Sequence, residues 1–417
     1  MATAAFHNCS SRGSFGAGRL PVVLSRLAPR MTSIGRSRTG RDRSLVNEAA
    51  IRNTAALDHL STAATAGHAD AETGLGLLYA AGRGVPQSYI VAAQWYSKAA
   101  VQSYAPGEYN LGVLYFLGRG VQRNYDLAWK WADKSASQGY APAQAFLGWL
   151  YGTGRGPVKN YRRALKWYRR AAEQGYAGGQ YELGMLYEAG DGIPRNEVVA
   201  AAWIRKAANQ DYIPAQAELG YLYSTGNGVP RDQAQADGWW LKAGLQGSPI
   251  AQCALGNQLE RHGGYYVQAA FWFHKAAVAG NADAEFNLAF LYASGNGVPQ
   301  DYTNAVKWYR RAASKNLAPA EFYLGNMYEK GRGVRQSYAR ALKWYRKAAN
   351  KGDVHGFVRR RSKGMKWRNT TLASCTPAAG IFPGAMPKRC SGIRNPQRKV
   401  TRMLRLLWQY FMKKAAV

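Results

Sequence analysis

The chain has 417 residues, of which 47% are hydrophobic, and it contains 13 tryptophans and 27 tyrosines. This composition excludes a wholly disordered polypeptide, and no run of apolar residues approaches the ~18 that a membrane-spanning helix needs. The formal net charge is +32. About two thirds of it lies in the two ends, with +7 in residues 1–43 and +15 in residues 354–417. The total charge is therefore weak ground for a nucleic-acid-binding function.

Residues 1–43 form a leader that is rich in arginine and serine, and we expect it to be disordered. Its one apolar run, "LPVVLSRLA" at 20–28, is interrupted by Arg26 and makes a poor core for a secretory signal. We therefore expect a cytoplasmic or organellar location. Two origins fit the leader: an organelle transit peptide, or an extended reading frame whose true start is Met31 or a later codon.

Residues 44–68 follow as half a repeat. The stretch "AALDHLSTAATAGHADA", which starts at Ala55 and runs into the first full repeat, has His59 where the repeats below have tryptophan. Half a unit at the start of a repeat array is typical of a terminal cap. We expect an N-terminal capping helix here.

The next feature is the segment "LYAAGRGVPQSY" at 78–89, which recurs six more times, beginning at Leu114, Leu150, Leu186, Leu222, Leu291 and Met327. A Gly-x-Gly with arginine between the glycines can bind phosphate. However, seven copies at a fixed period indicate architecture, and the arginine is replaced by Asp191, Asn227 and Asn296. The pattern therefore predicts a repeated turn.

Each repeat predicts two helices. We number positions from the glycine of the "LG" pair, which is Gly76, Gly112, Gly148, Gly184, Gly220, Gly256 and Gly325, with Ala289 in the seventh unit. The period is 36 residues, except for one step of 33 between Gly256 and Ala289. Leucine at −1, mostly leucine at +2 and mostly tyrosine at +3 share one helical face, so we expect these positions to be buried.

The predicted second helix carries a tryptophan in every unit: Trp95, Trp131, Trp167, Trp203, Trp239, Trp272, Trp308 and Trp344. A large aromatic side chain that is buried stabilises a fold by roughly 2–3 kcal/mol. We expect these tryptophans to fill the space between units, which explains them without a ligand.

The pattern "LGxLYxxGxGVxxDYxxAxxWYxKAAxxG" at 36 residues resembles the SEL-1-like repeat family, which is related to the tetratricopeptide repeats. The resemblance covers residues 69–353, about 68% of the chain. It implies an all-α, right-handed α/α superhelical solenoid of about eight 36-residue helix-turn-helix repeats. It also implies a non-enzymatic scaffold or adaptor for protein complexes.

By analogy with tetratricopeptide repeats, positions −3, +1 and +4 of the first helices point into a concave groove. We expect this groove to bind a protein partner through Tyr109, Phe116, Trp149, Tyr181, Met185, Tyr221, Phe286, Phe290 and Phe322. Aromatic side chains dominate the energy of many interfaces. The alternative is that part of this set packs on the adjacent second helix.

Basic side chains gather on the predicted second helices, at Arg162, Arg163, Lys166, Arg169, Arg170, Arg346 and Lys347. A solvated helix face explains such patches. The alternative is weak electrostatic contact with nucleic acid, an anionic membrane or an acidic partner.

In residues 354–417 the repeat is lost. The segment at about 398–414 has the pattern of a basic amphipathic helix, with Val400, Met403, Leu404, Leu407, Trp408 and Phe411 on one side. Three roles fit it: a cap for the open end of the solenoid, attachment to a membrane surface or nucleic acid, or no role at all.

The sequence offers no catalytic residue, metal site or cofactor motif. The six histidines are scattered, with no metal-ligand spacing. Cysteine-rich relatives linked to β-lactam hydrolysis carry a cysteine pair in each repeat, which is absent here. We therefore expect no enzyme. Nucleic-acid or membrane association through the basic ends is the alternative function, and a β-lactamase-like hydrolase is a weaker one.

Overall fold

The computed structural model describes residues 54–156, 158–261 and 264–351. These residues form seventeen α-helices, α3 to α19, and no strand. The leader 1–43 and the tail 354–417, with its expected amphipathic helix, lie outside the described residues. Helix α3 (Thr54–Thr65) occupies part of the segment in which we expect a cap, and Leu57 and Leu60 pack with Leu75 and Leu78 of the next helix.

The remaining helices form first and second helices of the repeats, each 13 residues long. The first helices are α4 (Ala69–Ala81), α6 (Ala105–Leu117), α8 (Ala141–Thr153), α10 (Ala177–Ala189), α12 (Ile213–Thr225), α14 (Pro249–Arg261), α16 (Ala282–Ser294) and α18 (Ala318–Lys330). The second helices are α5 (Tyr89–Val101), α7 (Tyr125–Ser137), α9 (Tyr161–Glu173), α11 (Glu197–Asn209), α13 (Gln233–Leu245), α15 (Tyr266–Val278), α17 (Tyr302–Ser314) and α19 (Tyr338–Asn350).

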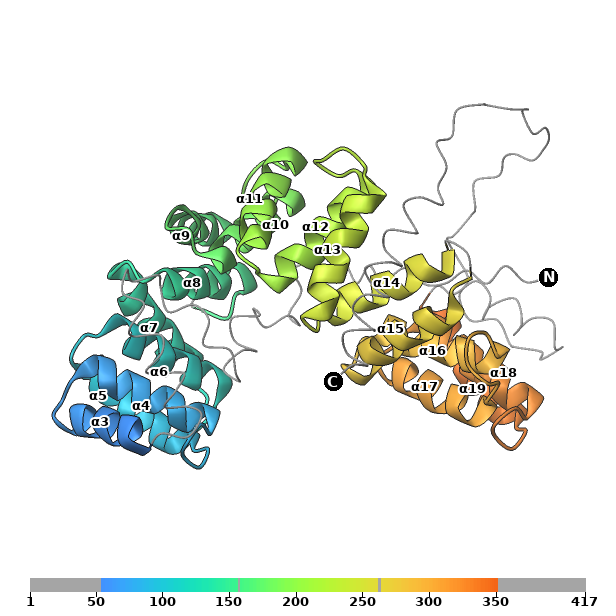
Figure 1. Ribbon diagram of the computed structural model, residues 1–417, viewed down its shortest axis with the longest axis horizontal. Helices are drawn as coiled ribbons and strands as arrows, with labels where there is room; N and C mark the ends of the chain where they lie inside the picture. Colours follow the sequence, from blue (N-terminus) through green and yellow to red (C-terminus); the bar gives the residue numbers. More distant parts are fainter. Residues whose placement is uncertain (1–53, 157, 262–263, 352–417) are drawn as a thin grey trace, which may run out of the picture. The chain divides into compact units, whose positions relative to one another are not determined.

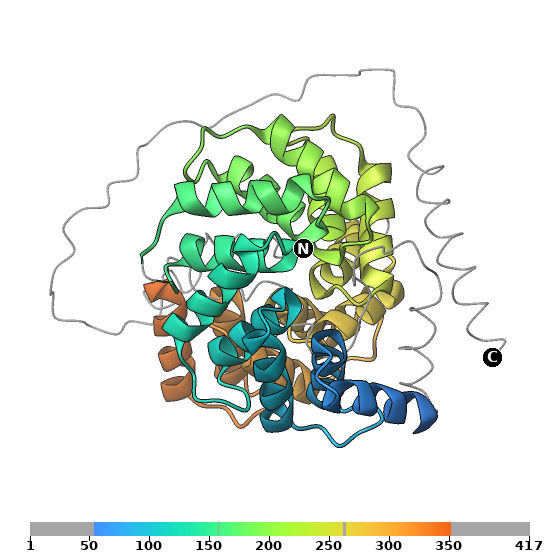
Figure 2. The ribbon, with the colours of Figure 1, turned by 90° about the vertical axis from the view of Figure 1, so that its left-hand side faces the viewer.

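The described residues belong to two compact units, one with α3 to α12 and one with α13 to α19. Within each unit every helix packs on the next one along the chain. Figure 1 shows this order in the first unit from blue to green, and Figure 2 shows the same helices from the side. Each unit is thus an α/α solenoid stack, as the repeat predicts.

The repeated Gly-x-Gly is a turn. Its first glycine ends the helix in the left-handed conformation, as Gly118 does at φ 67° while its N–H donates to the carbonyl of Leu114. Its second glycine lies against the preceding repeat: a Cβ on Gly120 would lie 2.1 Å from the carbonyl oxygen of Tyr89. Both glycines are therefore explained by backbone geometry, with no phosphate required.

Six of the second helices begin at a polar cap. The side chain of Asn124 accepts a hydrogen bond from the backbone N–H of Leu127 at 2.9 Å. Ser88, Asn160, Asn196, Asp301 and Ser337 make the same contact at their helices. Such caps satisfy an N–H that the helix itself leaves without a partner.

The core follows the predicted first-helix positions closely. The leucines at −1 are all buried, and so are the residues at +2 in all eight repeats. The tyrosines at +3 are mostly half-buried, although Tyr151 and Tyr328 are buried. The glycine at position 0 has a specific reason: a Cβ on Gly76 would lie 2.6 Å from the ring of Tyr96 in the second helix.

The tryptophans differ from the prediction. Seven of the eight are only half-buried, and Trp272 alone is fully buried. The next residue along the chain, such as Tyr96, Tyr168 or Tyr309, is buried in every repeat. A cation three residues after each tryptophan lies over its ring; Lys206 Nζ, for example, is 4.0 Å from the centroid of Trp203. One ring face packs on the core and the other lies beneath a solvated charge.

A ladder of polar contacts joins the two helices in six of the eight repeats. Position −4 is glutamate or glutamine in all eight repeats, and all eight side chains are buried. Glu108 accepts a hydrogen bond from Gln138 Nε2 at 2.7 Å, thirty residues later at the end of the second helix. The same spacing joins Gln102 to Glu72, Gln174 to Gln144, Gln210 to Gln180 and Lys351 to Glu321.

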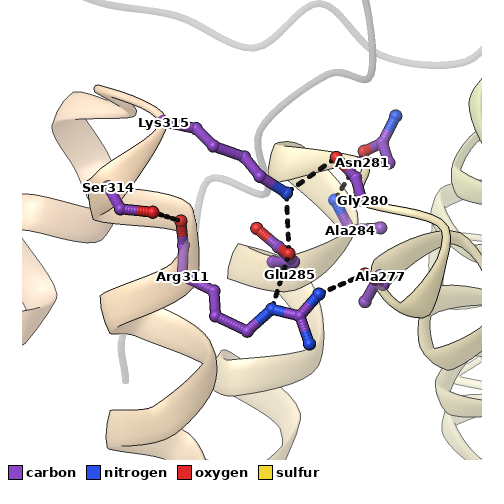
Figure 3. A network of polar contacts seen from close by, with 8 residues as sticks. All are labelled: Ala277, Gly280, Asn281, Ala284, Glu285, Arg311, Ser314 and Lys315. Atoms are coloured by element: carbon purple, nitrogen blue, oxygen red, sulfur yellow. Dashed lines mark hydrogen bonds and ion pairs between the residues drawn. The ribbon is translucent and has the colours of Figure 1, made fainter.

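In the second unit two contacts of the ladder are ion pairs, Lys315–Glu285 and Lys351–Glu321. Glu285 is fully buried, and its Oε1 accepts from Lys315 Nζ at 2.8 Å and from Arg311 Nε at 3.0 Å. Figure 3 shows both cations reaching Glu285 from α17 while they also contact the carbonyls of Gly280 and Ala277. These partners replace the water that Oε1 loses on burial, whereas Oε2 has no hydrogen-bond partner among the described residues.

Candidate functional site

The nine residues predicted for the groove divide into two groups. Tyr109, Phe116, Trp149 and Phe286 are buried, at 8%, 4%, 4% and 3% exposure, and these four therefore offer a partner little surface. Tyr181, Met185, Tyr221, Phe290 and Phe322 are half-buried.

The buried residues of the first unit form one aromatic cluster on α6 and α8. The ring of Phe116 lies 5.1 Å from Trp149 and 5.8 Å from Phe146, in both cases edge to face. Tyr109 lies 6.0 Å from Phe146. The guanidinium of Arg155 lies 5.4 Å from the centroid of Trp149. These contacts make the cluster a part of the core, because aromatic rings in such arrangements stabilise one another.

The half-buried residues of the first unit lie on two neighbouring first helices. Tyr181 and Met185 are on α10 and Tyr221 is on α12. The ring of Tyr181 lies 5.6 Å from that of Tyr212, the residue that precedes α12. We call these four residues the aromatic face.

A tyrosine that precedes four of the first helices was missed by the sequence interpretation. Tyr104, Tyr140, Tyr176 and Tyr212 recur at 36 residues, each at the N-terminal boundary of a first helix. Tyr140 packs on Tyr109 at 5.7 Å, as Tyr212 packs on Tyr181. Burial raises the pKa of Tyr140 to about 12, so its hydroxyl stays neutral. The 36-residue spacing of these tyrosines was the signal that could have found them.

In the second unit the aromatic residues meet around Tyr323 of α18, which the sequence interpretation also missed. Its ring lies 5.5 Å from Phe286, 5.9 Å from Phe290 and 5.5 Å from Phe322. Tyr323 also stacks on Tyr309 of α17 at 5.7 Å. Position −2 lies outside the three positions that the analogy selects, which is why it was not considered.

The basic residues predicted on α9 are all exposed. Arg170 lies over Trp167 and Arg163 over Tyr151, so the structure gives both a packing role. Arg162, Lys166 and Arg169 form no ion pair within the described part of the chain. Of the pair on α19, Lys347 is exposed and lies over Trp344, while Arg346 is half-buried.

No metal-binding cluster emerges in residues 54–351 outside the gaps at 157 and 262–263. Within them, no three histidine, cysteine, aspartate or glutamate side chains could hold a metal ion together. Burial raises the pKa of the Glu260 carboxyl to about 8, against the opposing charge of Arg261. Among the helices that the structure describes, none combines the length and apolar character needed to cross a membrane.

Comparison with known proteins gives a consistent result. The family model described as Sel1 repeat matches eight segments: 69–103, 105–140, 141–176, 177–212, 213–248, 249–281, 282–317 and 318–353. The chain is similar to a Sel1 repeat protein from Oxalobacter formigenes, with 27% identity, a TM-score of 0.51 and coverage of 81% of this chain and 98% of that one.

The chain is also similar to c5321, a protective antigen present in uropathogenic Escherichia coli strains that displays an SLR fold. The identity is 33%, the TM-score is 0.46, and 74% of each chain is covered. No curated protein matches the chain.

Proposed function

Because the chain belongs to the Sel1 repeat family, whose members generally mediate protein–protein interactions and are typically non-catalytic, we propose that it is a non-enzymatic scaffold that binds a protein partner on its first helices. The groove proposed from the sequence is narrowed here to its half-buried members. In the first unit these are Tyr181, Met185 and Tyr221, which form the aromatic face together with Tyr212.

The observation that carries this proposal is the partial exposure of Tyr181, Met185 and Tyr221 on neighbouring first helices. Leucines at −1 and +2 already fill the core of these repeats, so the three side chains are not needed to complete it. Tyrosine and methionine are enriched in protein interfaces, because they bury large area at modest entropic cost.

The experiment is affinity capture by the full chain from a lysate of its source organism, read by mass spectrometry. The test variant is Tyr181→Ala with Tyr221→Ala. The matched control is Ile90→Ala with Val198→Ala, which removes two apolar side chains that are 62% and 68% exposed on second helices of the same unit. Trp149 is unsuitable as a test position because its truncation would open a cavity in the core.

We expect the wild type and the control to capture the same discrete set of proteins and the Tyr181/Tyr221 variant to lose it. An identical set from all three would contradict the proposal. The capture is repeated at two salt concentrations, because contacts made by the basic residues of α9 would weaken steeply with salt while an aromatic interface would not.

A further inference from the structure

The end of the repeat array carries a large excess of positive charge. Residues 302–351 contain twelve lysines and arginines but only two acids, Glu321 and Glu329. Both acids already have partners, because Glu321 pairs with Lys351 and Glu329 accepts a hydrogen bond from the hydroxyl of Tyr345. Most of the cations in this stretch therefore have no carboxylate within it to balance them, and such a surface attracts anions.

Two of these cations meet at one side chain. The hydroxyl of Tyr328, on α18, accepts a hydrogen bond from Arg310 Nη2 of α17 at 2.8 Å. The Cζ atoms of Arg310 and of Arg340, which belongs to α19, lie 5.9 Å and 5.7 Å from the centroid of the Tyr328 ring. One tyrosine thus holds guanidinium groups from two successive second helices.

Neither arginine is neutralised by an acid. Arg310 and Arg340 are exposed, and neither forms an ion pair with another described residue. Burial by itself would raise the pKa of the Tyr328 hydroxyl, but hydrogen bonding and charge from Arg310 and Arg340 outweigh burial and lower that pKa. Two like charges held at one point repel each other, and an anion bound between them would relieve that repulsion.

The convergence of two arginines is specific to the eighth repeat. Tyr151 and Tyr223 occupy the same position, +3, in the third and fifth repeats. Each has one arginine at its ring, Arg163 at 5.5 Å and Arg205 at 5.8 Å. At the place of the second arginine these repeats have other residues, Asp133 and Gln235. One arginine at this tyrosine is thus a packing contact used in several repeats, whereas two arginines meet at it only in the eighth.

We propose that Arg310 and Arg340 bind a phosphate monoester, carried by a phosphorylated serine or threonine of a partner protein. A guanidinium offers parallel N–H donors that match the oxygens of a phosphate. A phosphate monoester carries close to two negative charges and so balances two such cations, whereas a carboxylate carries one. Tyr328 is a positioning residue, because its hydroxyl orients Arg310 while the side chain itself is only 5% exposed.

A phosphate on a protein fits this place better than a nucleic-acid strand does. Proteins that bind single strands combine a basic groove with exposed aromatic rings on which the bases stack, and the buried ring of Tyr328 offers no such surface. The proposal rests on the proposed scaffold function and names the chemistry of the partner at one place in the second unit.

The probes are three amidated, fluorescein-labelled peptides, Gly-Ala-X-Ala-Gly, in which X is phosphoserine, glutamate or serine. Binding to the full chain is followed by fluorescence anisotropy at physiological ionic strength, which screens contacts with the basic ends. We expect the phosphoserine peptide to bind at least about tenfold more tightly than the serine peptide, because it adds charge-assisted hydrogen bonds. The glutamate peptide should be intermediate. Equal affinity for the phosphoserine and glutamate peptides would overturn the proposal.

Two pairs of substitutions locate the site. Arg310→Gln with Arg340→Gln should remove most of the preference for phosphoserine. The matched control is Arg163→Gln with Arg205→Gln, which takes two exposed arginines from tyrosines at the same repeat position and changes the net charge equally. The control should bind like the wild type. Equal weakening by the two pairs would mean that total charge binds the peptide, and the proposal would fail.

Arg310→Lys with Arg340→Lys tests the guanidinium groups themselves, since it keeps both charges and removes the planar fork of donors. We expect several-fold weaker binding of the phosphoserine peptide, and binding as tight as that of the wild type would show that the assigned contacts are wrong. A thymidine oligonucleotide tests the other class of partner. If Arg310→Gln with Arg340→Gln weakens the oligonucleotide and leaves the phosphoserine peptide unchanged, the proposal is overturned.

Tyr328→Phe keeps the ring and removes the acceptor that orients Arg310. It should reduce the preference for phosphoserine over glutamate, which a loss of stability alone would not change, and an unchanged preference would contradict the positioning role. None of these outcomes alters the capture experiment at Tyr181 and Tyr221, which lie in the other unit, so the two proposals fail separately.

Discussion

The tyrosine that follows the repeated tryptophan shows how one position can be satisfied in different ways. Tyr96, Tyr168 and Tyr309 are fully buried with unpaired hydroxyls, whereas Tyr345 donates to Glu329. In the first three, the residue at position +4 is Ala80, Gly152 or Ala293, which has no acceptor in its side chain. In these four repeats the tyrosine ring fills space against the first helix. Its hydroxyl has a hydrogen-bond acceptor only in the eighth repeat, where the residue at position +4 is a glutamate.

This difference predicts opposite effects of the same substitution. Tyr168→Phe should leave the free energy of unfolding unchanged or raise it, because it removes an unpaired buried hydroxyl. Tyr345→Phe should lower it by about 1–3 kcal/mol, because it removes a hydrogen bond to a carboxylate. Urea unfolding of the full-length variants, followed by circular dichroism, measures both. A larger loss for Tyr168→Phe than for Tyr345→Phe would show that this account of the hydroxyls is wrong.

At the scale of the element, the turn between the two helices is specified by backbone contacts. Gly120 has a φ of 69° and lies against the carbonyl of Tyr89, at the start of the preceding second helix. Gly139, at the end of a second helix, has a φ of 88°, and a Cβ added there would meet no atom within 4 Å. The two glycines share the left-handed conformation and differ only in the space around them.

Comparing Gly120→Ala with Gly139→Ala separates conformation from close contact. Gly139→Ala should cost about 1–2 kcal/mol of stability, the strain of a left-handed residue with a side chain. Gly120→Ala should cost roughly 1–3 kcal/mol more, because its methyl group displaces the neighbouring helix. Denaturant titration gives both values. Equal costs would mean that the second glycine of the turn is required for its conformation alone.

The 36-residue periodicity correctly predicted the helix positions at which burial alone determines the residue type. The leucines at −1 and +2 were identified as core because both lie on one helical face. The tryptophans were assigned a larger burial than they have, because the residue that follows each of them was not considered as the one that fills the core. The pairing of position −4 with a residue thirty positions later was not recognised, although glutamate or glutamine recurs there in every repeat.

At the scale of the whole molecule, the candidate site was predicted less completely than the fold. Analogy selected positions −3, +1 and +4 but gave no means of separating surface from core at those positions. Phe116 and Trp149 are buried in a cluster with Phe146, whereas Tyr181 and Tyr221 retain exposed surface although Tyr181 packs on Tyr212. Such differences depend on which side chains meet across adjacent repeats, and a single repeat pattern does not contain that information.

The central claim is that a protein partner covers the first helices of the first unit. Hydroxyl-radical footprinting of the full chain, with and without the captured partner, tests it most directly. The account predicts that oxidation of Tyr181, Met185 and Tyr221 falls severalfold in the complex, while oxidation of Tyr125 and Tyr338, which are 40% and 56% exposed on second helices, stays unchanged. Protection of Tyr125 and Tyr338 with no change at Tyr181, Met185 and Tyr221 would contradict it.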